Sequence, residues 1–121
     1  MLGLGIDVVD IDRFRKVLER TPAIQTRVFT SSEISGLSSK MDQAASLAAR
    51  FAAREATMKV LGVGIGAIDL HDVSIERHSS GEPRLLVTGR AKELAKAMGI
   101  ANWFVSLSHT GHVAVAVVAA A

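Results

Sequence analysis

The segment from Asp42 to Leu61 constrains the fold most. Its residues are rich in alanine and include neither glycine nor proline, a composition that predicts one long helix of about twenty residues. Gly62 follows directly, as is typical of the residue that ends a helix. The chain has 121 residues, a size that predicts a single domain over residues 1–121. The fold must therefore place one long helix within one domain.

Shorter segments of both secondary-structure types flank this helix. Alternating apolar residues predict a strand over Leu2–Val8, and apolar residues at helical spacing predict a helix from Asp10 or Asp12 to Arg20. Another short helix is expected to start at Thr30, in a stretch rich in serine and glycine that runs to Lys40. The later segments predict a hairpin of Val73–His78 and Arg84–Thr88, a helix over Gly89–Met98, and a hairpin of Trp103–Leu107 and Val113–Val118. We therefore expect an α+β fold in the order strand, helices, hairpin, helix, hairpin.

The composition narrows the class of protein. Apolar residues make up 49% and charged residues 21%, which excludes intrinsic disorder. A mean hydropathy of +0.31 is high for a small domain, so part of the apolar surface is expected to meet another subunit. The absence of cysteine excludes disulfides, a thiolate nucleophile and cysteine-ligated metals. The net charge is only +2, so the pI near 9.4 is no evidence for nucleic-acid binding.

The sequence also predicts the location of the protein in the cell. Asp7 interrupts the N-terminal apolar residues where a secretory leader would continue. The longest apolar run, Val113–Ala121, is nine residues long, whereas a helix needs about 20 to span a bilayer. We therefore expect a soluble, cytoplasmic protein without membrane association.

One carboxylate interrupts an apolar surface of the long helix. On a helical wheel, Glu55 lies among apolar neighbours and opposite the polar sector of this helix. That sector comprises Gln43, Ser46, Arg50, Arg54 and Thr57. A buried carboxylate costs several kcal/mol unless it is paired, protonated or bound to a metal. An i,i+4 ion pair with Lys59 would explain the presence of Glu55 on this surface by a structural role alone.

A second carboxylate, Asp7, interrupts the N-terminal strand. It shares one strand face with Gly3 and Gly5, which leave space beside it. A position at the end of the strand, where Asp7 would act as a cap, is the structural explanation. If Asp7 and Glu55 are adjacent in space, they suit Mg²⁺, which is commonly held by two protein carboxylates together with substrate phosphates and waters.

Lysine and glycines after the long helix suggest contact with phosphate. Lys59 supplies positive charge, and Gly62, Gly64 and Gly66 allow backbone amides to approach an anion. The pattern is not a Walker A or Rossmann motif, so a helix cap followed by a turn is the alternative. His109 is interpreted as a phosphate or base contact, because no nucleophile elbow or acidic partner supports a serine hydrolase.

The first predicted helix and the segment after it are basic. Five basic residues oppose one acidic residue, Glu19, between positions 13 and 27. They are Arg13, Arg15, Lys16, Arg20 and Arg27. Such a patch is either a solvated face or a surface that attracts an acidic partner. With only five aromatic residues in the chain, an acidic protein is favoured over single-stranded nucleic acid.

These features coincide with the motifs of a known family. The segments Gly5–Phe14, Arg50–Ala56 with Lys59, Gly62–Gly66 and Ser106–Thr110 match its motifs in order and spacing. Over nearly its whole length the chain resembles the holo-acyl carrier protein synthases, the small bacterial 4′-phosphopantetheinyl transferases. The resemblance implies the fold of that family. It also implies transfer of 4′-phosphopantetheine from coenzyme A to a serine of apo-acyl carrier protein, with release of adenosine 3′,5′-bisphosphate.

The resemblance assigns roles to individual residues. It implies that Asp7 and Glu55 bind Mg²⁺ and that Glu55, Lys59 and Asp7 are catalytic. The implied coenzyme A-binding residues are Arg50, Lys59, Gly62, Gly64 and His109. Arg13 and Arg20 match the surface that receives the carrier protein, and the family is typically a homotrimer with active sites between subunits.

Some alternatives stay open at this level. The chain could be a non-catalytic module that binds coenzyme A or a nucleotide, or a basic protein-interaction domain in which Asp7 and Glu55 are structural. The proton acceptor could be Glu55, Asp7 or a metal-bound water. Arg54 departs from the family, which more often has lysine there, and since the charge is kept we expect little effect.

Overall fold

The fold is described by a computed structural model that covers residues 1–37, 39 and 42–121. Lys40, the end of the predicted serine- and glycine-rich stretch, lies outside the described residues. The helices and strands are β1 (Gly3–Asp10), α1 (Ile11–Arg20), α2 (Ile24–Val28), α3 (Ser31–Ser35), α4 (Gln43–Leu61), the 3-10 helix η1 (Leu70–Asp72), β2 (Val73–Arg77), β3 (Pro83–Val87), α5 (Gly89–Ala97), β4 (Trp103–His109) and β5 (Val113–Ala120).

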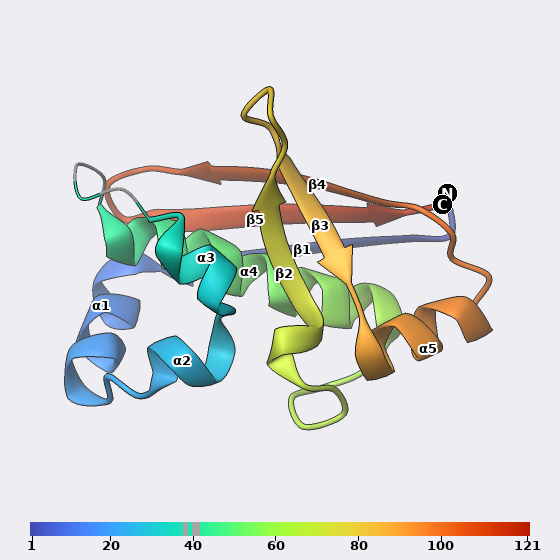
Figure 1. The fold of residues 1–121 in the computed structure, drawn as a ribbon, viewed down its shortest axis with the longest axis horizontal. Helices are drawn as coiled ribbons and strands as arrows, with labels where there is room; N and C mark the ends of the chain where they lie inside the picture. Colours follow the sequence, from blue (N-terminus) through green and yellow to red (C-terminus); the bar gives the residue numbers. More distant parts are fainter. Residues whose placement is uncertain (38, 40–41) are drawn as a thin grey trace.

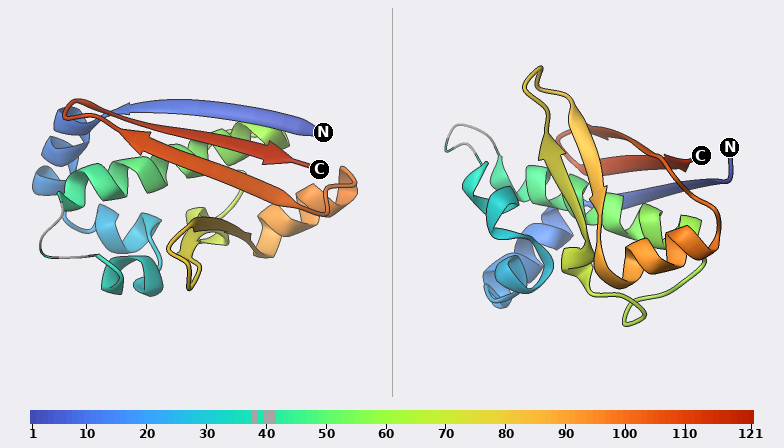
Figure 2. Two further views of the ribbon diagram at one scale, coloured as in Figure 1. Left: turned by 90° about the horizontal axis from the view of Figure 1, so that it is seen from above. Right: turned by 45° about the vertical axis from the view of Figure 1, so that its right-hand side comes forward.

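The chain forms a layered α+β fold. Three antiparallel strands make a sheet in the order β1-β5-β4, and β2 pairs with β3 in a separate hairpin. The helix α4 runs along one face of the three-stranded sheet (Figure 1). On its other side lie the short helices, the β2–β3 hairpin and α5, so α4 is enclosed between two layers (Figure 2). The termini lie side by side, where the amide of Leu2 donates to the carbonyl oxygen of Ala120 at 2.7 Å.

The long helix is buried nearly all round. Its predicted bounds are confirmed: Asp42 accepts a hydrogen bond from the amide of Ala45, and Gly62 ends the helix with a φ of 71°. From Arg50 onward, the polar sector expected from the helical wheel does not face solvent, because the second layer covers it, whereas Gln43 at the start of the helix is exposed. Arg54 and Thr57 are fully buried, and the Thr57 hydroxyl donates to the carbonyl oxygen of Ala53 at 2.7 Å.

The strand β1 packs on α4 through its glycine face. A Cβ atom at Gly5 would overlap the carbonyl oxygen of Ala56, and one at Gly3 would lie 2.7 Å from a methyl carbon of Val60. The absence of side chains therefore brings the strand backbone against the helix. Asp7 lies on this same inner face, in mid-strand rather than at the strand end, so the strand-end explanation is wrong.

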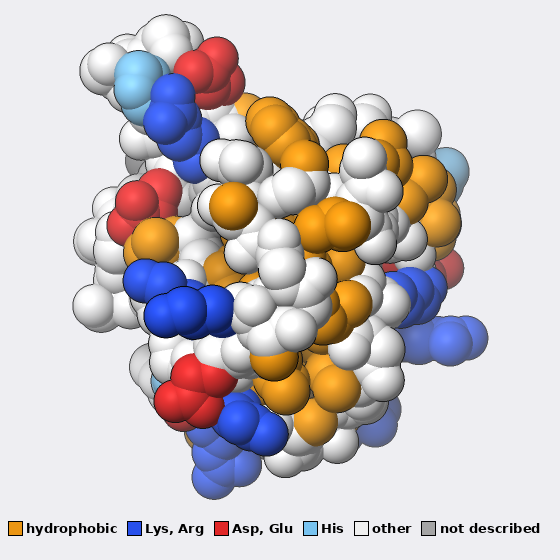
Figure 3. Space-filling view, turned by 90° about the vertical axis from the view of Figure 1, so that its right-hand side faces the viewer, with side chains coloured by type: hydrophobic (Ala, Val, Ile, Leu, Met, Phe, Trp, Pro, Cys, Tyr) orange, Lys and Arg blue, Asp and Glu red, His pale blue; other side chains and the backbone are white. Residues whose placement is uncertain are grey.

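The apolar face of the three-stranded sheet is exposed. Leu4, Ile6 and Val8 of β1 are 63%, 55% and 59% exposed, and Phe104 of β4 is 59% exposed. Their cross-strand neighbours on β5, such as Val117 opposite Ile6, are apolar as well. Hydrophobic side chains also reach the surface at the end of the molecule that carries the termini (Figure 3). The sheet thus presents an unpartnered apolar face, as expected from the high hydropathy.

A buried ion pair joins the second layer to α4. Arg54 donates from Nη1 and Nη2 to the carboxylate of Glu33 at 3.0 and 2.5 Å, and from Nε to the carbonyl oxygen of Leu70 at 2.9 Å. The Glu33 carboxylate also accepts from the amides of Thr30 and Ile75. Four elements, α3, α4, η1 and β2, therefore meet at this pair. The network uses several donors of the Arg54 guanidinium, and a lysine ammonium would not match their geometry, so the retained charge alone does not make the two residue types equivalent here.

The chemistry of Glu33 explains why the pair stays charged. Burial alone raises the pKa of Glu33, but the hydrogen bonds and charge of Arg54, with two backbone amides, outweigh it and lower the pKa below its ordinary value. The pair therefore stabilises the fold at neutral pH. That contribution is lost on acidification, as the pH falls through the lowered pKa.

Most predicted elements are confirmed. The capping box at Thr30 is present, with Glu33 closing it, and Asp10 caps α1 by accepting from the amide of Arg13 at 2.8 Å. The sequence analysis missed α2 and η1, which are five and three residues long. Elements this short have no helical period to detect and depend on tertiary contacts.

Replacing Glu33 by glutamine should destabilise the protein strongly. The substitution leaves the buried Arg54 charge uncompensated, which typically costs about 3–5 kcal/mol. The free energy of unfolding is measured by urea denaturation at neutral pH. The matched control is Arg15→Gln, which breaks the half-exposed pair of Arg15 with Asp42 and should cost much less, because solvent screens that pair. Equal losses for the two variants would contradict the role given to the buried pair.

Candidate functional site

Asp7 and Glu55 face each other across the contact of β1 with α4. The close approach at Gly5 brings the two backbones together just before Asp7. Both carboxylates line one pocket of about 330 Å³, and Arg13 of α1 and Phe51 of α4 form part of its wall. The structure therefore brings together the two carboxylates that stood out in the sequence.

Glu55 has an unsatisfied carboxylate oxygen. Its Oε1 atom is buried and accepts no hydrogen bond within the described part of the chain. Burial raises the pKa of Glu55 above its ordinary value, and the neighbouring charge of Asp7 adds to this, whereas Lys59 opposes it. An ionised Glu55 is thus a cost to stability unless a cation compensates it.

Lys59 is paired with the strand rather than with Glu55. Its Nζ atom donates to Asp7 Oδ1 at 3.2 Å and to the carbonyl oxygen of Ile6 at 2.7 Å. The i,i+4 ion pair of Lys59 with Glu55 that would have explained Glu55 structurally is not among the ion pairs of the described residues. Glu55 and Asp7 thus offer hard oxygen donors to a divalent cation such as Mg²⁺. No group of three or more histidine, cysteine or carboxylate side chains gathers for a metal within the described residues.

The glycines after α4 form an exposed turn. Gly62 has a left-handed backbone conformation, and the amide of Val63 donates to the carbonyl oxygen of Met58 at 3.0 Å, as in a helix C-cap. The structural interpretation of Gly62 is therefore confirmed. Gly62 and Gly64 are exposed, and neither lines the pocket of Asp7 and Glu55.

Arg50 and His109 line a second pocket of about 430 Å³. It lies between α4, the β2–β3 hairpin and the end of β4, and Pro83 and Ser108 contribute to it. Arg50 is 5% exposed, and its Nε atom is buried without a hydrogen-bond partner among the described residues. Burial lowers the pKa of Arg50, and the nearby positive charges of Arg77 and Arg54 act in the same direction, against the attraction of Glu33. A buried guanidinium with an unused donor favours an anionic ligand.

The two predicted carrier-protein contacts occupy different places on α1. Arg13 lines the pocket of Asp7 and Glu55, whereas Arg20 is the exposed last residue of the helix. The basic side chains of α1 thus extend from the exposed end of the helix to the pocket of Asp7 and Glu55.

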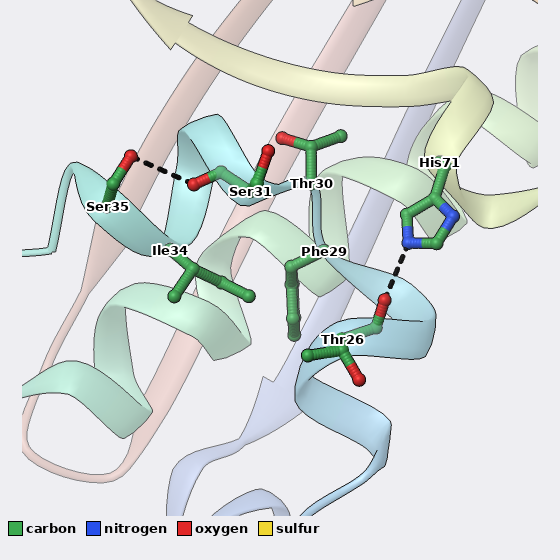
Figure 4. Close-up of a pocket in the computed structure, with 7 residues that line it drawn as sticks. All are labelled: Thr26, Phe29, Thr30, Ser31, Ile34, Ser35 and His71. Atoms are coloured by element: carbon green, nitrogen blue, oxygen red, sulfur yellow. Dashed lines mark hydrogen bonds between the residues drawn. The ribbon is translucent and has the colours of Figure 1, made fainter.

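A third pocket lies elsewhere. It has about 550 Å³ between α2, α3 and η1, and Phe29 and Ile34 form its apolar wall. At its rim a ring nitrogen of His71 lies 2.8 Å from the carbonyl oxygen of Thr26, and the Ser35 hydroxyl donates to the carbonyl oxygen of Ser31 (Figure 4). Its lining residues include no carboxylate, lysine or arginine, so it does not resemble a metal or phosphate site.

The predicted site residues form two groups within one chain. Asp7, Glu55, Lys59 and Arg13 lie at the β1 edge of the three-stranded sheet, whereas Arg50 and His109 lie toward its β4 edge. The pockets share no lining residue.

Comparison with known proteins shows to which class of protein this chain belongs. The model of the 4′-phosphopantetheinyl transferase superfamily matches residues 3–118. A holo-[acyl-carrier-protein] synthase of Streptomyces avermitilis is 47% identical, over 99% of this chain and 97% of its own. One of Moorella thermoacetica is 43% identical, over 97% of this chain and 91% of its own. The chain belongs to the holo-[acyl-carrier-protein] synthase family. It is an enzyme of the phosphopantetheinyl transferase class.

Solved structures of family members have the same fold. The Helicobacter pylori synthase in complex with coenzyme A matches with a TM-score of 0.84 and 32% identity, over 98% of this chain and 99% of that one. The Bacillus anthracis synthase in complex with CoA (3′,5′-ADP) matches with a TM-score of 0.77 and 29% identity, over 98% of this chain and 95% of that one. The expected α+β fold is therefore confirmed. The model also has no helix long and apolar enough to cross a membrane in the residues it describes.

Several pocket residues escaped the sequence analysis. Phe51 and Val17 form the apolar side of the carboxylate pocket, and Arg77 and Pro83 belong to the second pocket. Phe51 lies one helical turn before Glu55, a spacing that could have indicated a shared surface. Arg77 has no such signal, because it ends a strand that only the tertiary fold brings next to Arg50.

In this family member, Glu55→Gln should raise the melting temperature of the metal-free protein. At neutral pH an ionised Glu55 is partly desolvated beside Asp7, and glutamine removes that charge. Mg²⁺ should raise the melting temperature of the wild type and have a smaller effect on the variant. Differential scanning calorimetry with Mg²⁺ and with chelator measures both effects. A melting temperature that responds equally to Mg²⁺ in both proteins would exclude Glu55 as a metal ligand.

Proposed function

We propose that this chain transfers 4′-phosphopantetheine from coenzyme A to a serine of apo-acyl carrier protein in a Mg²⁺-dependent reaction in the cytoplasm. The observation that carries the proposal is the pair of Asp7 and Glu55 in a pocket that Arg13 lines, where one Glu55 oxygen accepts no hydrogen bond from any part of the chain that the structure describes. Membership of the holo-[acyl-carrier-protein] synthase family supports the same reaction.

The proposed binding of Mg²⁺ is based on the oxygen atoms that this pocket offers as ligands. Asp7 and Glu55 supply carboxylate oxygens, which suit Mg²⁺, and the substrate pyrophosphate would complete its ligands. When bound, the cation neutralises charge on the phosphate oxygens during transfer. Lys59, held beside Asp7, adds positive charge on the same side of the pocket. Gly62 and Gly64 place exposed backbone in the turn that follows Lys59.

The reaction exchanges one bond at phosphorus. The serine oxygen of the carrier protein attacks the β-phosphorus, and the bond to the α-phosphate oxygen breaks, which releases adenosine 3′,5′-bisphosphate. The serine proton must leave at the same time. Glu55 is the better acceptor of the two carboxylates, since its Oε1 has no hydrogen-bond partner among the described residues and its pKa is raised, whereas Lys59 already donates to Asp7.

The basic face of α1 is proposed as the docking surface for the carrier protein. Arg13 lies at the carboxylate pocket, and Arg20 extends the positive charge to the end of the helix. An acidic carrier protein docked there would have its serine directed toward Asp7 and Glu55. The exposed arginines would mainly accelerate association, an effect that salt weakens.

A homotrimer with active sites between subunits is part of the proposal. The exposed apolar face with Leu4, Ile6, Val8 and Phe104 needs a protein partner. A head-to-tail ring would set the β1 edge of one copy against the β4 edge of the next. Such an arrangement would combine the Asp7 and Glu55 pocket of one subunit with the Arg50 and His109 pocket of its neighbour.

The transferase activity is tested by intact-mass spectrometry. Apo-acyl carrier protein is incubated with coenzyme A and this protein, either with Mg²⁺ or with chelator. We expect the carrier to gain one phosphopantetheine with Mg²⁺ and none with chelator. If several carriers stay unmodified while coenzyme A still binds, the chain is a binding module rather than a transferase.

A charge on the exposed sheet face should dissociate the oligomer. Ile6→Lys places an ammonium in the centre of the apolar face, where burial against another subunit would be costly. We expect a smaller particle in sedimentation velocity and loss of transfer activity. The control is Leu86→Lys, which also charges an exposed apolar residue but lies on β3, outside the three-stranded sheet. Wild-type size for the Ile6 variant would refute the sheet face as the interface.

A further inference from the structure

Arg15 of α1 is bound to the start of α4. Its guanidinium donates from Nη1 and Nη2 to the two carboxylate oxygens of Asp42, at 3.1 and 2.9 Å. This bidentate pair joins α1 to the residue that caps α4. Arg13, by contrast, lines the carboxylate pocket, and Arg20 is exposed at the end of α1. The basic patch that the sequence predicts is therefore divided, because Arg15 is already held by a carboxylate of the same chain.

Asp42 belongs to the lining of the second pocket. Among the described residues that line this pocket, Asp42 is the one carboxylate. Asp42, Ser46 and Arg50 follow each other at intervals of four residues along α4, so they share one face of the helix. Arg50 Nη1 donates to the hydroxyl of Ser46 and, at 3.2 Å, to its carbonyl oxygen. A carboxylate thus lies at one end of this row and a buried guanidinium at the other.

The charge that Asp42 presents to the pocket depends on Arg15. The hydrogen bonds from Arg15 are the main cause that lowers the pKa of Asp42, so the carboxylate stays ionised at neutral pH. Paired with Arg15, this carboxylate has a neutralising partner within hydrogen-bond distance. Without Arg15, an uncompensated negative charge would lie beside the pocket and repel an anion there.

We infer that Arg15 is a positioning residue for the anionic substrate that acts through Asp42: the pair cancels the negative charge beside the second pocket, so that Arg50 can attract an anion. The inference rests on the proposed function, which makes coenzyme A the substrate. Under that proposal one helix serves both substrates. Arg13 and Arg20 face the carrier protein, whereas Arg15 acts on coenzyme A without touching it.

The test measures binding of adenosine 3′,5′-bisphosphate, the product of the proposed reaction, by isothermal titration. Arg15→Gln should weaken this binding about 3- to 10-fold at low salt, since a unit charge acts on a phosphate dianion through solvent over about two helical turns. The difference from the wild type should shrink at high salt, because salt screens the exposed carboxylate. Unchanged affinity at low salt would overturn the inference.

A double variant separates the effect of charge from the effect of structure. Arg15→Gln combined with Asp42→Asn should restore the wild-type affinity, because no uncompensated charge is left beside the pocket. Asparagine caps a helix about as well as aspartate, so the start of α4 is kept. If the pair were merely a structural contact, the double variant would bind as weakly as Arg15→Gln, and that result would overturn the inference.

The matched control is Lys16→Gln, at the next position of α1. It removes the same charge from an exposed side chain that is not part of the pocket lining. We expect the wild-type affinity for the bisphosphate. Equal weakening by Lys16→Gln and Arg15→Gln would attribute the effect to the overall charge of α1 and would overturn the role of the pair.

Steady-state kinetics separate this inference from the docking of the carrier protein. Arg15→Gln should raise the KM for coenzyme A, and a rise in the KM for the carrier protein alone would overturn the inference. The binding pattern of the three variants needs no turnover. That pattern without transfer activity would support the role of Arg15 and refute the transferase. Transfer activity with bisphosphate binding that is insensitive to Arg15 would refute the inference alone.

Discussion

The contact of β1 with α4 is the constraint on which the candidate site depends. A side chain at Gly5 would overlap the backbone of Ala56, so the strand reaches this distance only with glycine. Asp7 follows on the same face and therefore lies in the same pocket as Glu55. The two carboxylates repel each other, and this repulsion contributes to the raised pKa of Glu55. The fold tolerates this cost at one position, as is typical of a functional site.

The buried ion pair of Arg54 and Glu33 fixes the packing on the opposite side of α4. It joins the helix to α3, η1 and β2 and so sets the rotation of α4 about its axis. That rotation directs Glu55 toward β1 and Arg50 toward the β2–β3 hairpin. A buried ion pair adds little net stability compared with apolar packing, but it requires one geometry. The role of the pair in this fold is to position Glu55 and Arg50 on two sides of α4.

The arrangement of the two pockets connects the site with the exposed sheet face. The carboxylate pocket and the Arg50 pocket lie toward opposite edges of the sheet β1-β5-β4. The outer face of this sheet is apolar although it is exposed in a single chain. Assembly through that face would bury it and bring unlike edges together. Under the proposed function, oligomerisation and catalysis would therefore use the same surface, and a change in one would affect the other.

The long helix, the two hairpins, the capping residues and the residue types of the site can all be predicted from the amino-acid sequence. These depend on local periodicity, helix propensity and turn chemistry, which act over a few neighbouring residues. It also identified Asp7 and Glu55 as unusual, because each interrupts an apolar or glycine-rich surface. Three other features became evident from the folded chain alone: the glycine face of β1 packs inward, Arg54 is buried, and Arg77 lines the same pocket as Arg50. These outcomes depend on contacts between distant segments, and such contacts leave no period in the sequence.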